Sequence, residues 1–276
     1  MQLTVQGREA YAYTGGRAFD PALPCLVFVH GALHDHSVFT LLARWFAHHG
    51  YGVLAVDLPG HGRGAGPALP SVEAAGAWLL DLLSAAGVTQ AALAGHSMGS
   101  LIALEAAAQA PERASHLLLL GTAFPMKVSE ALLSTAATAP EKAMAMVNVF
   151  SHSTQAAKPG YPGPGSWLHG GNLALMRRIQ STSSEANLFL HDFQVCDRYA
   201  GGLEAAARVR CPSHVLAADR DVMTAPKQAQ ALVQALKATV HRIPEAGHSM
   251  MAEAPDTVLA ALQSALSSTS QPVRQG

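Results

Sequence analysis

The residues best suited to chemistry lie in one short segment, Gly95 to Gly99, whose sequence GHSMG has the pattern G-x-S-x-G. A predicted strand, Ala91 to Ala94, comes directly before it, and a predicted helix, Met98 to Gln109, follows. In that context a serine sits on a strained strand-to-helix turn, and glycines allow the neighbouring elements to approach closely. We therefore expect Ser97 to be a nucleophile that faces a cleft at the carboxyl end of a sheet. The competing interpretation is that Ser97 only caps the helix.

A serine hydroxyl needs a base to become a nucleophile, and His248 has the best position among the 14 histidines. It follows the last predicted strand, in a loop from which its side chain could reach the cleft. The imidazole in turn needs a carboxylate to fix its tautomer. The loop after the predicted strand His214 to Ala217 offers Asp219 and Asp221. We favour Asp221 because it lies beyond the turn, further from the strand.

Backbone N–H groups can stabilise the oxyanion of a tetrahedral intermediate if they point into the cleft. Met98, directly after the nucleophile, supplies one such group. The second is expected from the loop after the predicted strand Cys25 to Val29, where we favour Ala32 over Leu33.

Three other histidines and a glycine-rich turn are expected to have structural rather than catalytic roles. We expect His30 to stabilise its loop by hydrogen bonding rather than to transfer protons. For His96, too, a structural role competes with a role as the base. The segment Asp57 to Gly62 (DLPGHG) is typical of a bracing turn. A catalytic role for Asp57 or His61 is the less favoured interpretation.

Short apolar runs alternate with longer amphipathic stretches along most of the chain, which is typical of parallel strands joined by crossover helices. We predict an α/β fold with a mostly parallel sheet and a hairpin at its start. The predicted strands are Leu3 to Val5, Ala10 to Tyr13, Cys25 to Val29, Gly52 to Val56, Ala91 to Ala94, His116 to Leu120, His214 to Ala217 and Thr239 to Ile243. The main predicted helices between them are 38–48, 71–86, 98–109, 225–236 and 256–266.

The alternation stops between Phe124 and Ser184, where helix-like segments occur without a strand candidate. We predict an inserted helical cap at 124–184 on a core made of 1–123 and 185–276. Within the cap, Lys158 to Ser166 carries three glycines and three prolines, a composition that suits neither a helix nor a central strand. We expect this stretch to be a hinge or the edge of a lid, and the polar residues 267–276 to be frayed.

These features together resemble the α/β-hydrolase superfamily, and the resemblance covers nearly the whole chain. Five features occur in the family's order: the His30-Gly31 loop, the turn after Asp57, the Ser97 turn, the Asp221 loop and the Gly247-His248 pair. The resemblance implies an eight-stranded sheet with an antiparallel second strand, helices on both faces, and a helical cap after the sixth strand. It also implies that Ser97, Asp221 and His248 form a catalytic triad.

The type of nucleophile narrows the choice among the relatives. Haloalkane dehalogenases and epoxide hydrolases use an aspartate at this turn, so Ser97 argues against both. Hydrolases of carbon-carbon bonds in ring-fission products use serine, but many carry a tryptophan after the catalytic histidine, where this chain has Ser249. Noncatalytic ligand receptors also share the fold, and some retain the triad. The favoured function is that of a carboxylesterase-like serine hydrolase, without metal or cofactor, acting on a small to medium-sized ester or related acyl compound.

The cap would supply the variable wall of the substrate pocket. Its apolar residues could contact an acyl or alcohol group, although residues at helical spacing more often form a cap's own core. The candidates are Met126, Met144, Met146, Phe150, Trp167, Leu173 and Met176. Arg177 and Arg178 could meet a carboxylate but are expected in solvent. We assign His191 and Asp192 to the surface of an amphipathic helix that returns to the core.

The composition limits the partners of this chain of 276 residues, which has a formal charge of −1, 49% apolar residues and only 13% charged residues. The lack of a basic cluster argues against nucleic acid, and a small-molecule substrate is expected, with no oligomeric state predicted. Polar residues within the low-charge stretch Ala91 to Gln109 argue against a membrane span. The amino terminus shows no signal-peptide pattern, and three cysteines without metal-ligand spacing suit a reducing cytoplasm.

Overall fold

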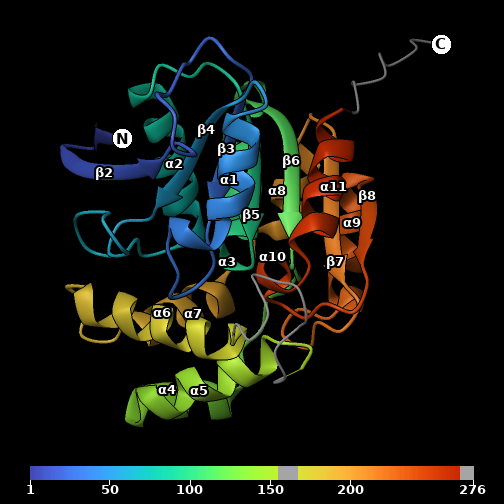
Figure 1. Ribbon diagram of the computed structural model, residues 1–276. Coiled ribbons are helices and arrows are strands. Elements are labelled where there is room, and N and C mark those ends of the chain that lie inside the picture. The colour runs from blue at the N-terminus through green and yellow to red at the C-terminus, as the bar shows by residue number, and fades with distance from the viewer. Residues whose placement is uncertain (155–166, 268–276) are drawn as a thin grey trace.

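The structure, a computed structural model, describes residues 1–154 and 167–267, and its centre is one eight-stranded sheet (Figure 1). The strands are β1 (Gln2–Val5), β2 (Arg8–Tyr13), β3 (Cys25–Val29), β4 (Gly52–Asp57), β5 (Ala91–His96), β6 (Ala114–Leu120), β7 (Ser213–Ala218) and β8 (Thr239–Ile243). Their order is β1-β2-β4-β3-β5-β6-β7-β8, with β2 antiparallel to both neighbours and every other pair parallel. The prediction of an eight-stranded, mostly parallel sheet is confirmed, and each predicted strand overlaps an observed one.

The central strands are buried along their whole length. Every residue of β3, β4, β5 and β7 is buried, because helices cover both faces of the sheet. A strand with one face in solvent would instead alternate between polar and apolar side chains. This arrangement accounts for the low share of charged residues in the chain.

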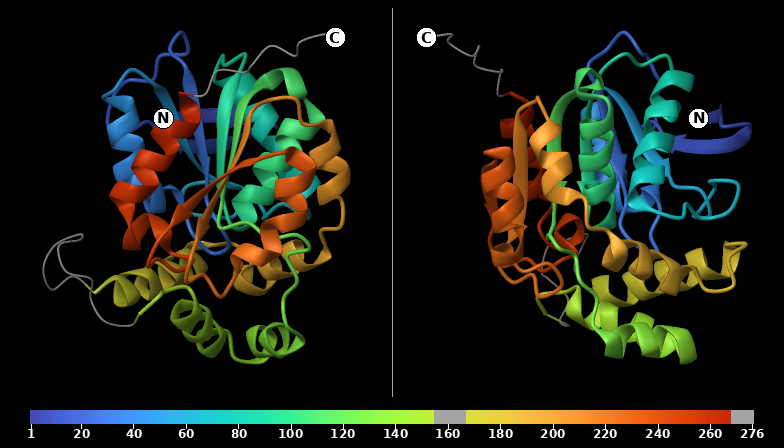
Figure 2. Two further views of the ribbon diagram at one scale, coloured as in Figure 1. Left: turned by 90° about the vertical axis from the view of Figure 1, so that its right-hand side faces the viewer. Right: turned by 180° about the vertical axis from the view of Figure 1, so that it is seen from behind.

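Two layers of helices enclose the sheet (Figure 2). On one face, α1 (Thr40–Ala47) and α11 (Pro255–Leu266) share an apolar core with the sheet. On the other face lie α2 (Val72–Ala85), α3 (Met98–Gln109), α8 (Gly202–Arg208) and α9 (Gln230–Leu236). The remaining helical segments of this part of the chain are short: η1 (His36–Phe39), η2 (Pro111–Arg113), η3 (Pro226–Ala229) and α10 (Met250–Glu253). The predicted helices on both faces are thereby confirmed.

Four further helices lie together across the carboxyl ends of the strands (Figure 1). They are α4 (Glu130–Thr138), α5 (Pro140–Phe150), α6 (Leu168–Thr182) and α7 (Leu188–Arg198). Their apolar side chains form a separate core cluster with Leu33 and Ala68, to which α7 contributes Leu188, Phe189 and Phe193. The predicted hinge 158–166 lies outside the described residues, as does the predicted frayed end beyond residue 267.

Among the helices of residues 1–154 and 167–267, none is both long enough and apolar enough to span a bilayer. The low-charge stretch Ala91 to Gln109 is β5 followed by α3, and both elements are buried within the core. Its apolar character therefore reflects burial inside the protein.

Candidate active site

Ser97 occupies the turn between β5 and α3, with a backbone φ of 53° and ψ of −120°. For a residue other than glycine this conformation is strained, and the surrounding structure must hold it. A Cβ atom on Gly95 would lie 2.0 Å from the carbonyl oxygen of Gly99, and one on Gly99 would lie 2.2 Å from the carbonyl oxygen of Val29. Close packing of β3, β5 and α3 therefore requires both glycines and holds Ser97 in the turn.

We expect Gly95→Ala to destabilise the fold by about 3 kcal/mol, because the added methyl group would meet backbone atoms that cannot swing aside. Gly171→Ala in α6 is the matched control, since its Cβ would meet nothing within 4 Å. Alanine is favoured over glycine inside a helix by about 0.5–1 kcal/mol, so this variant should be at least as stable as the parent. Urea unfolding measures both, and equal stability of the two variants would contradict the close packing at the turn.

His248 and Asp221 meet from the loops after β8 and β7. The Nδ1 of His248 lies 2.8 Å from Oδ2 of Asp221, and both side chains are buried. Oδ1 of Asp221 also accepts the backbone N–H groups of Met223 and Thr224, each at 2.8 Å. Burial alone would raise the pKa of Asp221, but His248 and the hydrogen bonds from Thr224 hold it well below its usual range. An ionised Asp221 requires a proton on Nδ1 of His248, which leaves Nε2 free to accept one.

Asp219, the alternative carboxylate, lies against a different residue. Its Oδ1 accepts a hydrogen bond from Nε of Arg242 at 2.5 Å, in a pair open to solvent. Of the two aspartates in this loop, Asp221 is the one that contacts His248.

Ser97 and His248 line the same cavity, which has a volume of about 550 Å³. Within residues 1–154 and 167–267, no hydrogen bond joins Oγ of Ser97 to His248. Such contacts are often long in an enzyme without substrate and tighten in the complex. The structure thus brings Ser97, Asp221 and His248 to one site, with the bond between the histidine and the aspartate already formed.

The loop after β3 reaches this cavity as well, and Ala32 lies on its wall. The N–H of Leu33, the alternative donor, is bonded to Oδ2 of Asp192 at 2.8 Å and is not available to a substrate. Met98 is the first residue of α3, where backbone N–H groups have no acceptor within the helix. Ala32 and Met98 therefore remain the candidate oxyanion donors.

Two other histidines near the site have bracing roles. Nε2 of His30 accepts the N–H of Leu58 at 3.1 Å, and burial, with His61 nearby, lowers the pKa of His30 to about 4. Nε2 of His96 donates to the carbonyl oxygen of His248 at 2.9 Å, and burial holds the pKa of His96 well below its usual value. Each ring is neutral and fixed by backbone partners, so neither competes with His248 as a base.

Known proteins are similar to this chain along most of its length. A family model described as "Alpha/beta hydrolase family" matches residues 26–261. The chain belongs to the alpha/beta hydrolase family. The pimeloyl-[acyl-carrier protein] methyl ester esterase of Chromobacterium violaceum is 30% identical, over 82% of this chain and 87% of the esterase.

Solved structures support the fold of this alpha/beta hydrolase. The enol-lactonase from Burkholderia xenovorans LB400 aligns with a TM-score of 0.79 and 20% identity, over 97% of this chain and 100% of that one. An esterase from Exiguobacterium antarcticum aligns with a TM-score of 0.80 and 16% identity, over 97% of this chain and 99% of that one. Identities this low are informative about the fold alone.

The cavity beside Ser97 in this alpha/beta hydrolase is mainly apolar. Three of the predicted pocket residues, Met126, Met146 and Phe150, lie on its wall. A neighbouring cavity of about 320 Å³ adjoins it, and the two share His34, His96, Ser151 and His248. His248 therefore lines both cavities.

Two predicted pocket residues lie elsewhere. Trp167 lines the neighbouring cavity and not the one beside Ser97. Met176 lines neither cavity, because its position on α6 faces the other helices of the α4–α7 layer, where it is buried in their shared core. Met144 is buried in the same core, and Leu173 packs against it while partly exposed. These three residues therefore belong to the apolar core of the helical layer and not to the wall of the cavity beside Ser97.

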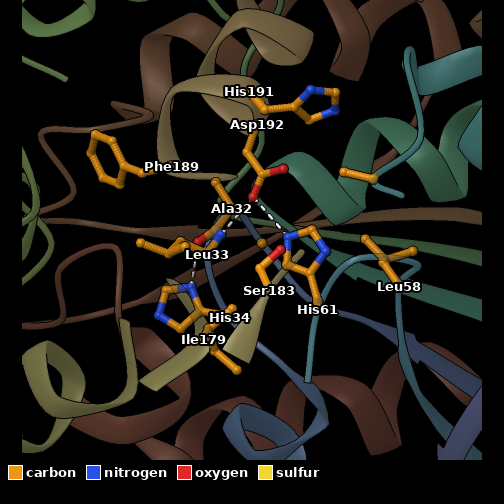
Figure 3. A network of polar contacts seen from close by, with 12 residues as sticks. Ala32, Leu33, His34, Leu58, His61, Ile179, Ser183, Phe189, His191 and Asp192 are labelled. Carbon is orange, nitrogen blue, oxygen red and sulfur yellow. Dashed lines mark hydrogen bonds and ion pairs between the residues drawn. The ribbon is translucent and has the colours of Figure 1, made fainter. Parts of the chain in front are cut away.

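The surface assignment of Asp192 is wrong, because its side chain is only 2% exposed. Its sequence position offered a signal: it lies four residues after Leu188 and three after Phe189, on the face of α7 that packs inward. His191 is partly exposed, as expected, and its Nε2 donates to the carbonyl oxygen of Leu69 at 2.9 Å. A charged residue on a buried helix face needs partners, and Asp192 finds them in the core (Figure 3).

Three residues could together ligate a metal: Asp35 and His36 at the start of η1, and Asp57 at the end of β4, whose ligand atoms lie within 4.8 Å of one another. Protein groups already bind these atoms. Asp57 accepts the backbone and ring N–H groups of His36 at 2.8 and 2.7 Å, and Asp35 pairs with Arg178 at 2.8 Å. The adjacent Arg177 pairs with Glu141. We therefore assign these residues a structural role, in which they hold the start of η1 against the end of β4.

Proposed function

We propose that the protein is a carboxylesterase-like serine hydrolase that needs no cofactor and works through an acyl-enzyme. One observation carries the proposal: His248, hydrogen-bonded to the buried Asp221, lines the cavity in which a strained turn presents Ser97. An oriented base beside a constrained serine is the arrangement that nucleophilic acyl transfer requires. The relative named as a methyl ester esterase supports an ester as the substrate.

In the proposed mechanism, Oγ of Ser97 attacks the ester carbonyl carbon while Nε2 of His248 takes the hydroxyl proton. Asp221 stabilises the resulting imidazolium through its bond to Nδ1. The N–H groups of Ala32 and Met98 bind the oxyanion. His248 then protonates the leaving alcohol, and a water molecule activated by His248 cleaves the acyl-enzyme and releases the acid.

We also propose that α4–α7 act as the cap that selects the acyl group. Their side chains supply apolar walls to the cavity beside Ser97, among them Leu132, Met146 and Phe193. A cavity of about 550 Å³ with such walls suits an aliphatic acyl chain of small to medium length. On this proposal the cap extends beyond residue 184 to the end of α7, because Phe193 packs into the same core as α4–α6.

A series of p-nitrophenyl esters from acetate to octanoate tests this function and its pocket together. We expect Met146→Trp to lower kcat/KM for the octanoate about tenfold more than for the acetate, because the indole occupies space that the longer chain needs. Leu175→Trp, which adds the same ring to the neighbouring cavity, is the matched control and should leave the chain-length preference unchanged.

Two results would count against the proposed function, and a third against the proposed pocket. If the wild type cleaves none of the esters but cleaves a vinylogous diketone, the protein is a carbon-carbon hydrolase. If it binds esters without cleaving them, it is a receptor. A shift in chain-length preference with Leu175→Trp, but not with Met146→Trp, would place the acyl group in the other cavity.

A further inference from the structure

The carboxylate of Asp192 lies against the loop that carries Ala32 and Leu33 (Figure 3). Its Oδ2 accepts the N–H of Leu33 at 2.8 Å, although 159 positions separate the two residues in the chain. Leu33 is fully buried and has a φ of 53°, a left-handed conformation that a leucine keeps only where its surroundings hold it. The carboxylate on α7 is one of the groups that hold this loop.

The same carboxylate oxygen bonds to the core on its other side. Nε2 of His61 lies 2.8 Å from Oδ2 of Asp192, and Nδ1 of His61 lies 3.1 Å from the carbonyl oxygen of Pro59. A carbonyl oxygen and an ionised carboxylate both accept hydrogen bonds, so a His61 ring with protons on both nitrogens would donate to each of them. Burial would lower the pKa of His61, but the charge and hydrogen bond of Asp192 raise it. The buried contact with His61 therefore helps to hold Asp192 against Leu33.

The peptide group between Ala32 and Leu33 is held at both ends. Asp192 accepts its N–H, and Nδ1 of His34 donates to its carbonyl oxygen at 2.8 Å. Nε2 of His34 in turn bonds to Oδ1 of Asn172 at 2.8 Å. Asp192 lies on α7 and Asn172 on α6, so both ends of the peptide are tied to the α4–α7 layer. Because a peptide group is planar, these two bonds fix the orientation of the Ala32–Leu33 peptide. The adjoining Gly31–Ala32 peptide carries the N–H of Ala32, and with its neighbour held it can turn only through the two backbone dihedrals of Ala32.

We propose that Asp192 is a positioning residue for catalysis: by holding the peptide between Ala32 and Leu33, it keeps the N–H of Ala32 directed at the oxyanion. The oxyanion site is then complete only while α7 is packed against the core. This inference rests on the proposed function, because it assigns Asp192 a role in the same acyl transfer. It predicts that loss of the carboxylate weakens binding of the transition state and leaves binding of the substrate nearly unchanged.

The test compares variants of neighbouring residues on α7. Asp192→Ala and Asp192→Leu remove the hydrogen-bond acceptor, one leaving space and the other filling it. Asp192→Asn keeps an oxygen that can accept the Leu33 N–H. His191→Ala is the matched control, because it breaks a different bond between α7 and the core, the one to the carbonyl oxygen of Leu69. Each variant is assayed for kcat and KM with p-nitrophenyl butyrate and for inhibition by hexyl trifluoromethyl ketone, which forms a tetrahedral adduct with a serine.

We expect Asp192→Ala and Asp192→Leu to lower kcat on the order of 10²-fold, as misplacement of a catalytic group by about 1 Å can do. Affinity for the ketone should fall by a similar factor, with KM within about threefold of the parent, because both kcat and the ketone report on the oxyanion site. Asp192→Asn keeps an acceptor oxygen, so its kcat should stay within about tenfold of the parent. If neither Asp192→Ala nor Asp192→Leu folds, this variant still tests the inference.

Losses of kcat and ketone affinity no larger than those of His191→Ala, or a change in KM alone, would overturn the inference. An Asp192→Asn variant as slow as Asp192→Ala would also overturn it, because the acceptor would then not be what matters. A failure of the proposed function looks different: the wild type itself would neither cleave the ester nor bind the ketone covalently.

Discussion

Ser97→Ala is expected to lower kcat for p-nitrophenyl butyrate by 10⁴-fold or more, on the order of what removal of a nucleophile costs when the catalytic residues act as a unit. The alanine lacks the oxygen that forms the acyl-enzyme, whereas the base and the oxyanion donors stay in place. The substitution removes only the Oγ atom. The turn itself is held by backbone packing at Gly95 and Gly99, so we expect the fold to be unchanged. Rates of the purified variant and parent, together with their circular dichroism spectra, measure the effect.

Contaminating esterase from the expression host is the main source of false activity in this assay. Both proteins are therefore purified in parallel, and the residual activity of each is titrated with hexyl trifluoromethyl ketone. If folded Ser97→Ala cleaves the ester at the rate of the wild type, Ser97 is not the nucleophile.

Asp221→Asn is expected to lower kcat on the order of 10³- to 10⁴-fold. The amide would donate to Nδ1 of His248 where the carboxylate now accepts at 2.8 Å, so the ring would carry its proton on Nε2. In that tautomer His248 cannot take the proton of Ser97, although the shape of the site is unchanged. The measurement is kcat with p-nitrophenyl butyrate at neutral pH.

Asp219→Asn is the matched control for the Asp221 prediction, since it makes the same chemical change two residues earlier in the same loop. Its carboxylate pairs with Arg242 at the surface, where an ion pair contributes about 0–1 kcal/mol, so activity should stay close to that of the parent. A larger kinetic loss for Asp219→Asn than for Asp221→Asn, with both proteins folded, would reverse the assignment of the acid.

The sheet could be predicted from the sequence because its signals are local. Apolar runs such as Cys25 to Val29 are bounded by glycine and proline, and parallel strands buried on both faces need no alternation. The order of strand, turn and helix around Ser97 follows from the two glycines, whose close contacts exclude any side chain. The family match over residues 26–261 and the eight-stranded sheet confirm this part of the interpretation.

Contacts between segments that are distant in the sequence could not be predicted from local patterns. The bond between Asp192 and Leu33 depends on how α7 packs against the loop after β3, and no spacing in the sequence encodes that packing. The same holds for Met176, where apolar character alone cannot distinguish the interior of the helical layer from the wall of the cavity. Asp192 could have been suspected because it interrupts the apolar face of α7, but its partners could not have been named.

The most direct test of the central claim is to locate the residue that an activated-serine probe modifies. Wild-type protein is treated with a fluorophosphonate, digested, and analysed by peptide mass spectrometry, with Ser97→Ala treated in parallel. The proposed function predicts one phosphonyl group on the peptide that contains Ser97 and none on that peptide in the variant. A folded wild type that hydrolyses esters but carries no label on Ser97 would contradict it.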